Sequence, residues 1–380
     1  MKSEDPVNLK NILKIPRFII EGIKFHAAGK LYSPKPTFST IRVTHRCNSR
    51  CPSCIFWKEN NKCDELSPQS IEALFKDKLF SSLEMLTLSG GEATLREDLA
   101  DIAEGVLKSC RNIRGITLCT NGFDNRRVIH AVKNLLKLAQ GRGNIKLYVS
   151  VSLDGIGHLH GKIRGVPDAF EKVTKTLTDL KEIQQNDNLF LSVNCVVQPL
   201  NVLHLKEIAA YGEENNLPLT FSPICVSDVF TNDEDVKKHL QFSPKQLAEL
   251  QKIIKNELMP RLRTFDRAYW QDYFNLSMGA KRRLPCLLLH HYLQIDARGV
   301  MRGCDFDSRF IYGHIKESEP HQIWFSKKSR NMRRTIKNND CHQCALHCNV
   351  GYSLAKEFFY YARYLLLEKF HHLSRKNIFR

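Results

Sequence analysis

The chain has 380 residues, 42% of them hydrophobic, which is enough to fill one large core and a smaller appended domain. It contains no stretch of about eighteen uninterrupted apolar residues, and its N-terminus lacks the apolar centre of a signal peptide. The sequence therefore argues against a membrane-spanning or exported protein and predicts a cytoplasmic one. The net charge of +17 lies largely in residues 1–36 and 326–380, which favours either solvated faces or contact with an acidic partner.

The thirteen cysteines indicate metal binding rather than disulfide bonds, because thiols in the cytosol stay reduced. Eight of them fall into two closely spaced groups: Cys47, Cys51 and Cys54, then Cys286, Cys304, Cys341, Cys344 and Cys348. The other five are isolated and are predicted to be small buried hydrophobic residues: Cys63, Cys110, Cys119, Cys195 and Cys225. The two groups are therefore the candidate metal sites.

The first segment, residues 1–36, is a basic extension. Apolar residues between positions 9 and 24 share one helical face and basic residues share another, although Pro16 interrupts the run. Such a helix either packs on the body of the protein or lies on an anionic membrane. The second alternative predicts peripheral contact with the inner membrane face.

From residue 37 onward, β-rich apolar runs alternate with helical patterns, which is typical of parallel βα units. Six strands are predicted, at 38–43, 83–88, 113–119, 145–153, 189–197 and 217–222. This number suffices for a partial α/β barrel.

Helix starts are predicted where Ser precedes Pro, because Ser caps a helix and Pro suits its first position. This occurs at Ser67 and Ser243, and Leu66 is expected to pack on Ile71. The chain then divides into five predicted segments: the extension 1–36, a barrel core 37–225, a helical bridge 226–280, a cysteine-rich domain 281–350, and an aromatic, basic helix 351–380.

Directly after the first strand, Cys47, Cys51 and Cys54 form a C-x3-C-x2-C run. Three thiolates hold three irons of a 4Fe-4S cluster, whereas a fully ligated cluster takes four. The fourth iron is then open to bind S-adenosylmethionine (SAM). A zinc knuckle is the alternative interpretation of this loop.

This spacing after a first strand resembles the radical SAM superfamily. The resemblance covers about residues 38–225 and implies a partial (β/α)6 TIM-like barrel that cleaves SAM to a 5'-deoxyadenosyl radical. The following strand ends resemble the family's SAM-binding motifs, although Ala93 stands where the family often has Pro. The residues expected to bind SAM are Gly90, Gly91, Glu92, Asn121, Ser152, Asp154 and Arg164.

The second cysteine group resembles the SPASM/twitch extension of radical SAM enzymes. A hairpin predicted at 295–300 brings Cys286 and Cys304 together, and the resemblance implies that these two bind a second 4Fe-4S cluster with Cys341 and Cys344. Cys348 is either spare or an exchange ligand. A zinc ribbon is the alternative. Asp305, beside Cys304, is a candidate catalytic base, with a solvated loop carboxylate as the other interpretation.

The sequence therefore predicts a radical SAM enzyme that removes hydrogen from a peptide or small-molecule C–H bond, leading to oxidation or cross-linking. The implied partner is an electron donor, either a reductase or a flavodoxin or ferredoxin. One alternative is a dehydrogenase of a small-molecule or lipid-linked precursor at the membrane surface. A second, of another class, is a basic scaffold that binds nucleic acid or membrane, although no nucleic-acid motif is present.

Overall fold

The computed structural model describes residues 33–59, 64–143, 145–184, 188–260, 262, 264–280, 291–304 and 307–335. The chain forms two compact units. One combines Lys35–Arg261 with His291–Met332, and the other combines Met1–Pro34, Leu262–His290 and Arg333–Arg380. The first unit holds the barrel. In the second unit the structure describes one long helix, α11 (Thr264–Ser277).

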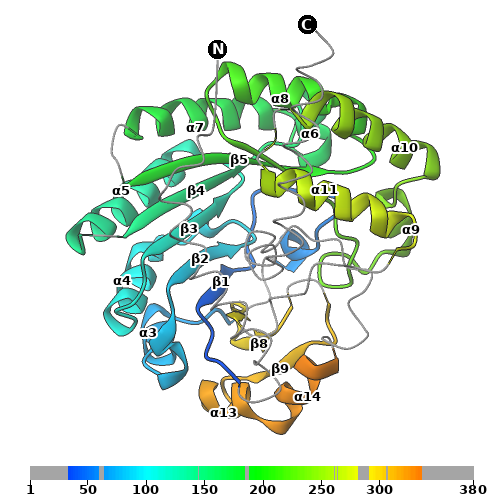
Figure 1. The fold of residues 1–380 in the computed structure, drawn as a ribbon. Coiled ribbons are helices and arrows are strands. Elements are labelled where there is room, and N and C mark those ends of the chain that lie inside the picture. The colour runs from blue at the N-terminus through cyan, green and yellow to red at the C-terminus, as the bar shows by residue number, and fades with distance from the viewer. Residues whose placement is uncertain are drawn as a thin grey trace, which may run out of the picture. The chain divides into compact units, whose positions relative to one another are not determined.

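The first unit is built on a nine-stranded sheet with the strand order β6-β5-β4-β3-β2-β1-β7-β8-β9 (Figure 1). Its first six strands are parallel: β1 (Phe38–Thr44), β2 (Met85–Gly90), β3 (Gly115–Thr120), β4 (Lys146–Ser152), β5 (Leu189–Val197) and β6 (Leu219–Pro223). Each predicted strand is confirmed to within two residues at either end. The polar turns after them therefore gather at one edge of the sheet.

Helices connect the parallel strands and cover one face of the sheet (Figure 1). They are α3 (Pro68–Phe75), α4 (Leu99–Ser109), α5 (Asn125–Gly141), α6 (His158–Arg164), α7 (Ala169–Ile183) and α8 (Leu205–Glu214). Short 3-10 turns lie among them: η1 (Phe56–Glu59), η2 (Lys78–Ser82), η3 (Ala93–Leu95) and η4 (Val202–His204). The predicted start of α3 is confirmed, because the Ser67 side chain accepts a hydrogen bond from Ser70 N at 3.1 Å.

After β6 the chain continues as helices. These are α9 (Glu234–Leu240), α10 (Pro244–Ile253) and a π-helical turn, η5 (Ile254–Leu258). The predicted start of α10 is confirmed as a capping box between Ser243 and Gln246.

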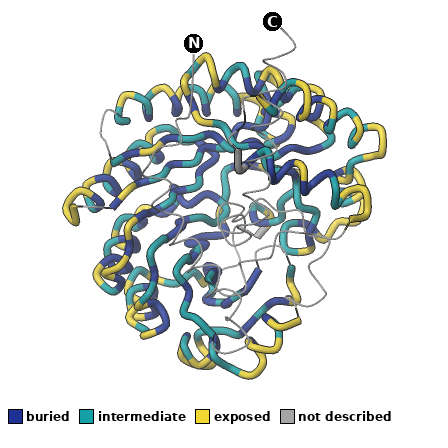
Figure 2. Tube along the Cα trace, viewed as in Figure 1, coloured by how far each residue is buried: buried dark blue, intermediate teal, exposed yellow. Residues whose placement is uncertain are grey.

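The two faces of the parallel strands differ in polarity, because successive residues of a strand point to opposite faces. The face under the helices is apolar and buried, with Leu88, Leu118 and Val149 packed against residues of α3, α4, α5 and α7. The other, inner face carries small polar residues such as Thr117 and Ser150, which are only half-buried. Figure 2 shows this alternation of buried and intermediate positions along the strands. The barrel thus has a polar interior.

The predicted hairpin is confirmed and extends the same sheet. Strand β7 (Tyr292–Ile295) pairs in parallel with β1, while β8 (Val300–Arg302) and β9 (Ile311–His314) are antiparallel. Gly299 makes the turn with a φ of +94°, which few other residues adopt. Two helices follow, α13 (Pro320–Phe325) and α14 (Lys327–Thr335).

Several predicted features lie outside the described residues. These are the amphipathic helix at 9–24, the segment 351–380, and Cys63, Cys286, Asp305, Cys341, Cys344 and Cys348. Within the described part of the chain, no helix is both long and apolar enough to span a bilayer.

Candidate cluster and SAM site

The loop after β1 carries the first cysteine group and folds back on itself. Cys54 N donates to Cys51 O at 3.2 Å, and the Trp57 indole donates to the same carbonyl at 3.0 Å. The Arg50 guanidinium donates to Cys47 O at 2.9 Å and lies over the Trp57 ring. These contacts give the three-cysteine loop a defined shape.

The surroundings of the thiols fit an iron-sulfur cluster. Burial raises the pKa of Cys47 to about 12 and that of Cys54 to about 11, and the nearby Glu92 and the other loop thiols contribute to the rise at Cys47. Three thiolates placed together here need positive charge beside them, which cluster irons supply. Among the residues that the structure describes, no three His, Cys, Asp or Glu side chains are arranged to hold a single metal ion.

The end of β2 lies against the start of this loop with no space for a side chain. A Cβ on Gly91 would lie 2.3 Å from Arg46 O, and one on Gly90 would lie 2.3 Å from Thr44 O. Gly91 N donates to Thr44 O at 2.8 Å. The two glycines of the Gly-Gly-Glu motif thus let β2 pack directly on the backbone of the cluster loop.

Glu92 is buried, and its carboxylate accepts four hydrogen bonds. Oε1 accepts from Thr94 N, Thr94 Oγ1 and Thr120 Oγ1, and Oε2 accepts from Asn121 N at 2.7 Å. Burial raises the pKa of Glu92, although these hydrogen bonds oppose the rise. The carboxylate joins the ends of β2 and β3 next to Cys47.

Asn121 brings the end of β3 to the same loop. Its Nδ2 donates to Asn48 Oδ1 at 2.7 Å and lies 3.8 Å from Cys47 Sγ, while its Oδ1 accepts from Phe123 N at 3.0 Å. The structure therefore brings together three of the predicted groups: the cysteines, Glu92 and Asn121.

Asp154 and Arg164 form a buried ion pair below the loop. Arg164 Nε lies 2.7 Å from Asp154 Oδ2, although its N–H does not point at that oxygen, so the contact is ionic rather than an aligned hydrogen bond. Asp154 Oδ1 accepts from Val196 N at 2.8 Å. The Arg164 guanidinium also lies beside the Cys51 thiol. Both oxygens of Asp154 are thus occupied by this chain's own groups.

The C-terminal turn of α6 holds the middle of the cluster loop. Arg164 O accepts from Arg50 N at 2.9 Å and from Ser49 Oγ at 2.8 Å, and the same hydroxyl lies 3.0 Å from Cys51 Sγ. Gly165 ends the helix with a φ of +66°, and a Cβ there would lie 2.3 Å from Arg50 O. Glycine is required here both for conformation and for space.

His160 supports the Asp154 turn from within the core. Its Nδ1 accepts from Asp154 N at 3.0 Å, which places the ring proton on Nε2. Burial lowers the pKa of His160 to about 3, so the ring is neutral. Asn201 Nδ2 donates to Asp154 O at 2.9 Å. The turn is therefore fixed by neutral donors and acceptors on its buried side.

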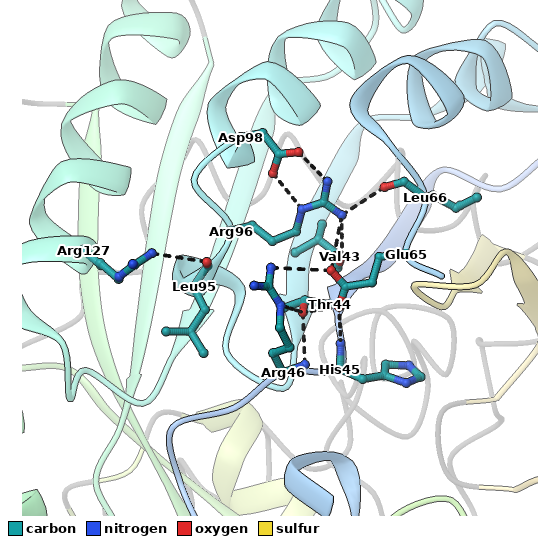
Figure 3. Close-up of polar contacts among 10 residues, drawn as sticks. All are labelled: Val43, Thr44, His45, Arg46, Glu65, Leu66, Leu95, Arg96, Asp98 and Arg127. Atoms are coloured by element: carbon teal, nitrogen blue, oxygen red, sulfur yellow. Dashed lines mark hydrogen bonds and ion pairs between the residues drawn. The ribbon is translucent and has the colours of Figure 1, made fainter. Parts of the chain in front are cut away.

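A second network, which sequence analysis did not identify, holds the end of β1 (Figure 3). The buried Arg96 donates to Val43 O at 3.0 Å and Leu66 O at 2.9 Å, and binds both oxygens of Asp98. Its position four residues after Glu92 is the only sequence signal, and that spacing does not predict burial.

Glu65 extends this network to the cluster loop. Its carboxylate accepts from Thr44 Oγ1 and from His45 N, and lies 3.6 Å from the Arg46 guanidinium (Figure 3). The residues that lead into the cysteine loop are therefore anchored before Cys47.

Comparison with known proteins identifies the family. The model of the Radical SAM superfamily matches residues 41–211, and that of an iron-sulfur cluster-binding domain, SPASM, matches residues 286–349. A GTP 3',8-cyclase of Aquifex aeolicus is 38% identical over 325 residues, which cover 78% of this chain and 92% of the relative. The chain belongs to the radical SAM superfamily.

Relatives of this radical SAM chain bear the names of different activities. An Fe-coproporphyrin III synthase of Methanosarcina barkeri is 28% identical over 301 residues, 74% of this chain and 72% of the relative. The sporulation killing factor maturation protein SkfB of Bacillus subtilis is 25% identical over 157 residues, 41% of this chain and 36% of the relative. The family is common to them, whereas the activity is not.

The solved structure of anSMEcpe with bound AdoMet has the same fold, with a TM-score of 0.61 at 16% identity over 87% of this chain and 99% of the other. The expected barrel and the C-terminal SPASM domain of a radical SAM enzyme are thus confirmed, and with them two kinds of cofactor: 4Fe-4S clusters and SAM. Cys304, the one predicted SPASM ligand among the described residues, is buried just after β8. Ser152 lies at the end of β4, half-buried on the inner face.

Proposed function

We propose that this radical SAM enzyme removes a hydrogen atom from a C–H bond of a peptide or small-molecule substrate, leading to oxidation or cross-linking. The observation that carries the proposal is the set of thiols of Cys47, Cys51 and Cys54, held beside Glu92 and Asn121 at the edge where the parallel strands end. When bound there, a reduced 4Fe-4S cluster and SAM supply a 5'-deoxyadenosyl radical.

The chain's own residues divide into two roles. In this proposal the three loop cysteines hold irons, and Glu92, Asn121 and Ser152 bind SAM. We assign Asp154 and Arg164 a positioning role, because their charged groups already pair with each other and with the loop. In the SPASM domain, Cys304 and the other predicted cysteines would hold a second cluster, which would accept the electron that a substrate radical loses on oxidation. Reduction of the first cluster requires a reductase, flavodoxin or ferredoxin.

Two substrate classes remain, each favoured by a relative. SkfB is named as a maturation protein of a killing factor, which favours a peptide. The identity with Fe-coproporphyrin III synthase extends over most of both chains, which favours a small molecule.

The proposal is tested with anaerobically reconstituted protein, dithionite and SAM. The wild type is expected to form 5'-deoxyadenosine, and Cys51→Ala is expected to form none. Cys110→Ala is the matched control, because this thiol is buried in the core and its Sγ lies 3.6 Å from Phe75 O. Wild-type levels of product from Cys51→Ala would refute the proposal.

A further inference from the structure

One buried side chain on the inner face of the barrel has unused hydrogen-bonding capacity. Gln294 on β7 is 0% exposed, and neither Nε2 nor Oε1 of its carboxamide has a hydrogen-bond partner among the residues that the structure describes. A buried amide without a partner is unfavourable and rare. Asn201, a buried carboxamide in the same unit, instead uses both of its ends, donating to Val196 O and accepting from Gln198 N. Gln294 is therefore an exception that calls for a ligand.

The register of the sheet places Gln294 on the inner face. It is paired with Thr40 of β1, and the next pair down the strands, Phe38 and Tyr292, stacks its rings 5.5 Å apart on the same face. Leu293 and Ile295, its neighbours in β7, belong to the apolar core on the opposite face. The carboxamide thus adds a donor and an acceptor to the polar inner wall.

Its position along the barrel suits a substrate group. Thr40 is level with Thr87 of β2, which in turn is level with Thr117 of β3, so hydroxyl groups continue the wall from Gln294. Thr44, where the cluster loop starts, is four residue steps along β1 from Thr40, a distance of about 13 Å. An extended substrate reaching from the loop into the barrel covers this distance with about four residues.

We propose that Gln294 binds the backbone of a peptide substrate. In an extended peptide, the N–H and C=O of one residue point the same way, so a carboxamide pairs with both at once. A carboxylate only accepts, and would leave Oε1 of Gln294 unpaired. The inference rests on the proposed function and selects its peptide alternative. Because the carboxamide is fully buried, binding in this way requires the groups that cover it to move apart.

The test is Gln294→Met, which keeps the length of the side chain and removes both hydrogen-bonding atoms. Equilibrium dialysis measures how much of a pool of N-acetylated, C-amidated hexapeptides the reconstituted, SAM-loaded protein retains. Retention is expected to fall about tenfold, the effect of losing one or two buried hydrogen bonds. The midpoint of thermal unfolding is expected to stay the same or rise, because an unpaired buried amide has been removed. Gln140→Met, the same change at an exposed position of α5, is expected to alter neither quantity.

A lower unfolding midpoint with unchanged peptide retention in Gln294→Met would show that the carboxamide is structural and would overturn the inference. Coproporphyrin III serves as a second probe, one that bears carboxylates. A wild-type protein that retains no peptide would also overturn the inference, whether or not it retains coproporphyrin III. The same preparations are assayed for 5'-deoxyadenosine. Absence of this product means that the proposed function has failed, whereas its formation with unchanged peptide retention in the variant counts against Gln294 alone.

Discussion

Two regions of the barrel hold the cluster loop, and they do so by different means. The ends of β2 and β3 hold its start through close backbone packing at Gly91 and the hydrogen-bonded carboxylate of Glu92. The C-terminal turn of α6 holds its middle through a carbonyl, and is itself held by the Asp154–Arg164 ion pair. Both regions include a glycine packed against the loop, but only the second rests on a buried ion pair. Substitutions at the glycine, the carboxylates and the buried histidine test the contribution of each region separately.

The largest effect is expected from Gly91→Ala. The added Cβ would lie 2.3 Å from Arg46 O and 2.6 Å from His45 O, and these backbone atoms cannot yield without moving the loop. The variant is expected to lose the loop cluster, about four irons per chain, and all 5'-deoxyadenosine formation. Gly141→Ala is the control, because a Cβ there meets nothing within 4 Å. Full iron content in Gly91→Ala would mean that the loop adapts to the added side chain and that close packing at Gly91 is not needed for cluster binding.

The next effect is expected at the ion pair. Asp154→Asn leaves the Arg164 charge buried without its partner, since the two side chains are only 3% and 14% exposed. The free energy of unfolding, measured in urea, is expected to fall by about 3 kcal/mol. Asp168→Asn breaks an exposed pair with Lys172 and is expected to change stability little. If the two variants were equally stable, charge would not be what holds the α6 turn.

A smaller effect is expected from Glu92→Gln. The substitution removes the negative charge next to the loop and replaces one acceptor oxygen by an NH2 donor. The remaining oxygen cannot accept hydrogen bonds both from Asn121 N and from the Thr94 and Thr120 groups. SAM affinity is expected to fall about tenfold with the iron content unchanged. Glu97→Gln is the control, because the Glu97 side chain is 85% exposed. Unchanged affinity would remove Glu92 from the SAM site.

The smallest effect is expected at His160, whose folded pKa of about 3 lies far below its usual value. The unfolded chain therefore takes up a proton here as the pH falls below about 6.5, while the folded chain does not, so stability decreases on acidification. Between pH 6.5 and 5.5 the wild type is expected to lose about 1 kcal/mol more than His160→Gln does. Parallel stability curves in urea for the two proteins would contradict a neutral, buried His160.

The sequence predicted the parts of this molecule that depend on local pattern. Alternation and β-branched residues gave the six parallel strands, and the burial expected for Cys110 and Cys195 is confirmed. Cys119 and Cys225 are half-buried rather than buried. In β3, Cys119 alternates with the buried Leu118 and therefore lies on the polar inner face of the sheet. The partial exposure of Cys119 was therefore predictable in principle from the alternation of residues along the strand.

Contacts between distant segments were not predictable in the same way. The sequence did not predict the ion pair between Asp154 and Arg164, which a turn and one short helix bring together, and their predicted contact with SAM stays a prediction. Nothing local indicates that Arg96 donates to carbonyls of Val43 and Leu66, or that β7 pairs with β1. Side chains that hold a site in place leave weaker sequence signals than those that bind its cofactors.

The pairing of β7 with β1 also bears on how this protein can be dissected. Strand β1 lies between β2 and β7, so residues of the SPASM match complete the hydrogen bonding of the strand that leads into the first cysteine group. Truncation before residue 286 would leave the backbone of Phe38–Ile41 as an open sheet edge, which invites intermolecular pairing and aggregation. The two matched segments therefore share one sheet. A barrel expressed alone is expected to be less stable and more prone to aggregate than the barrel within the whole chain.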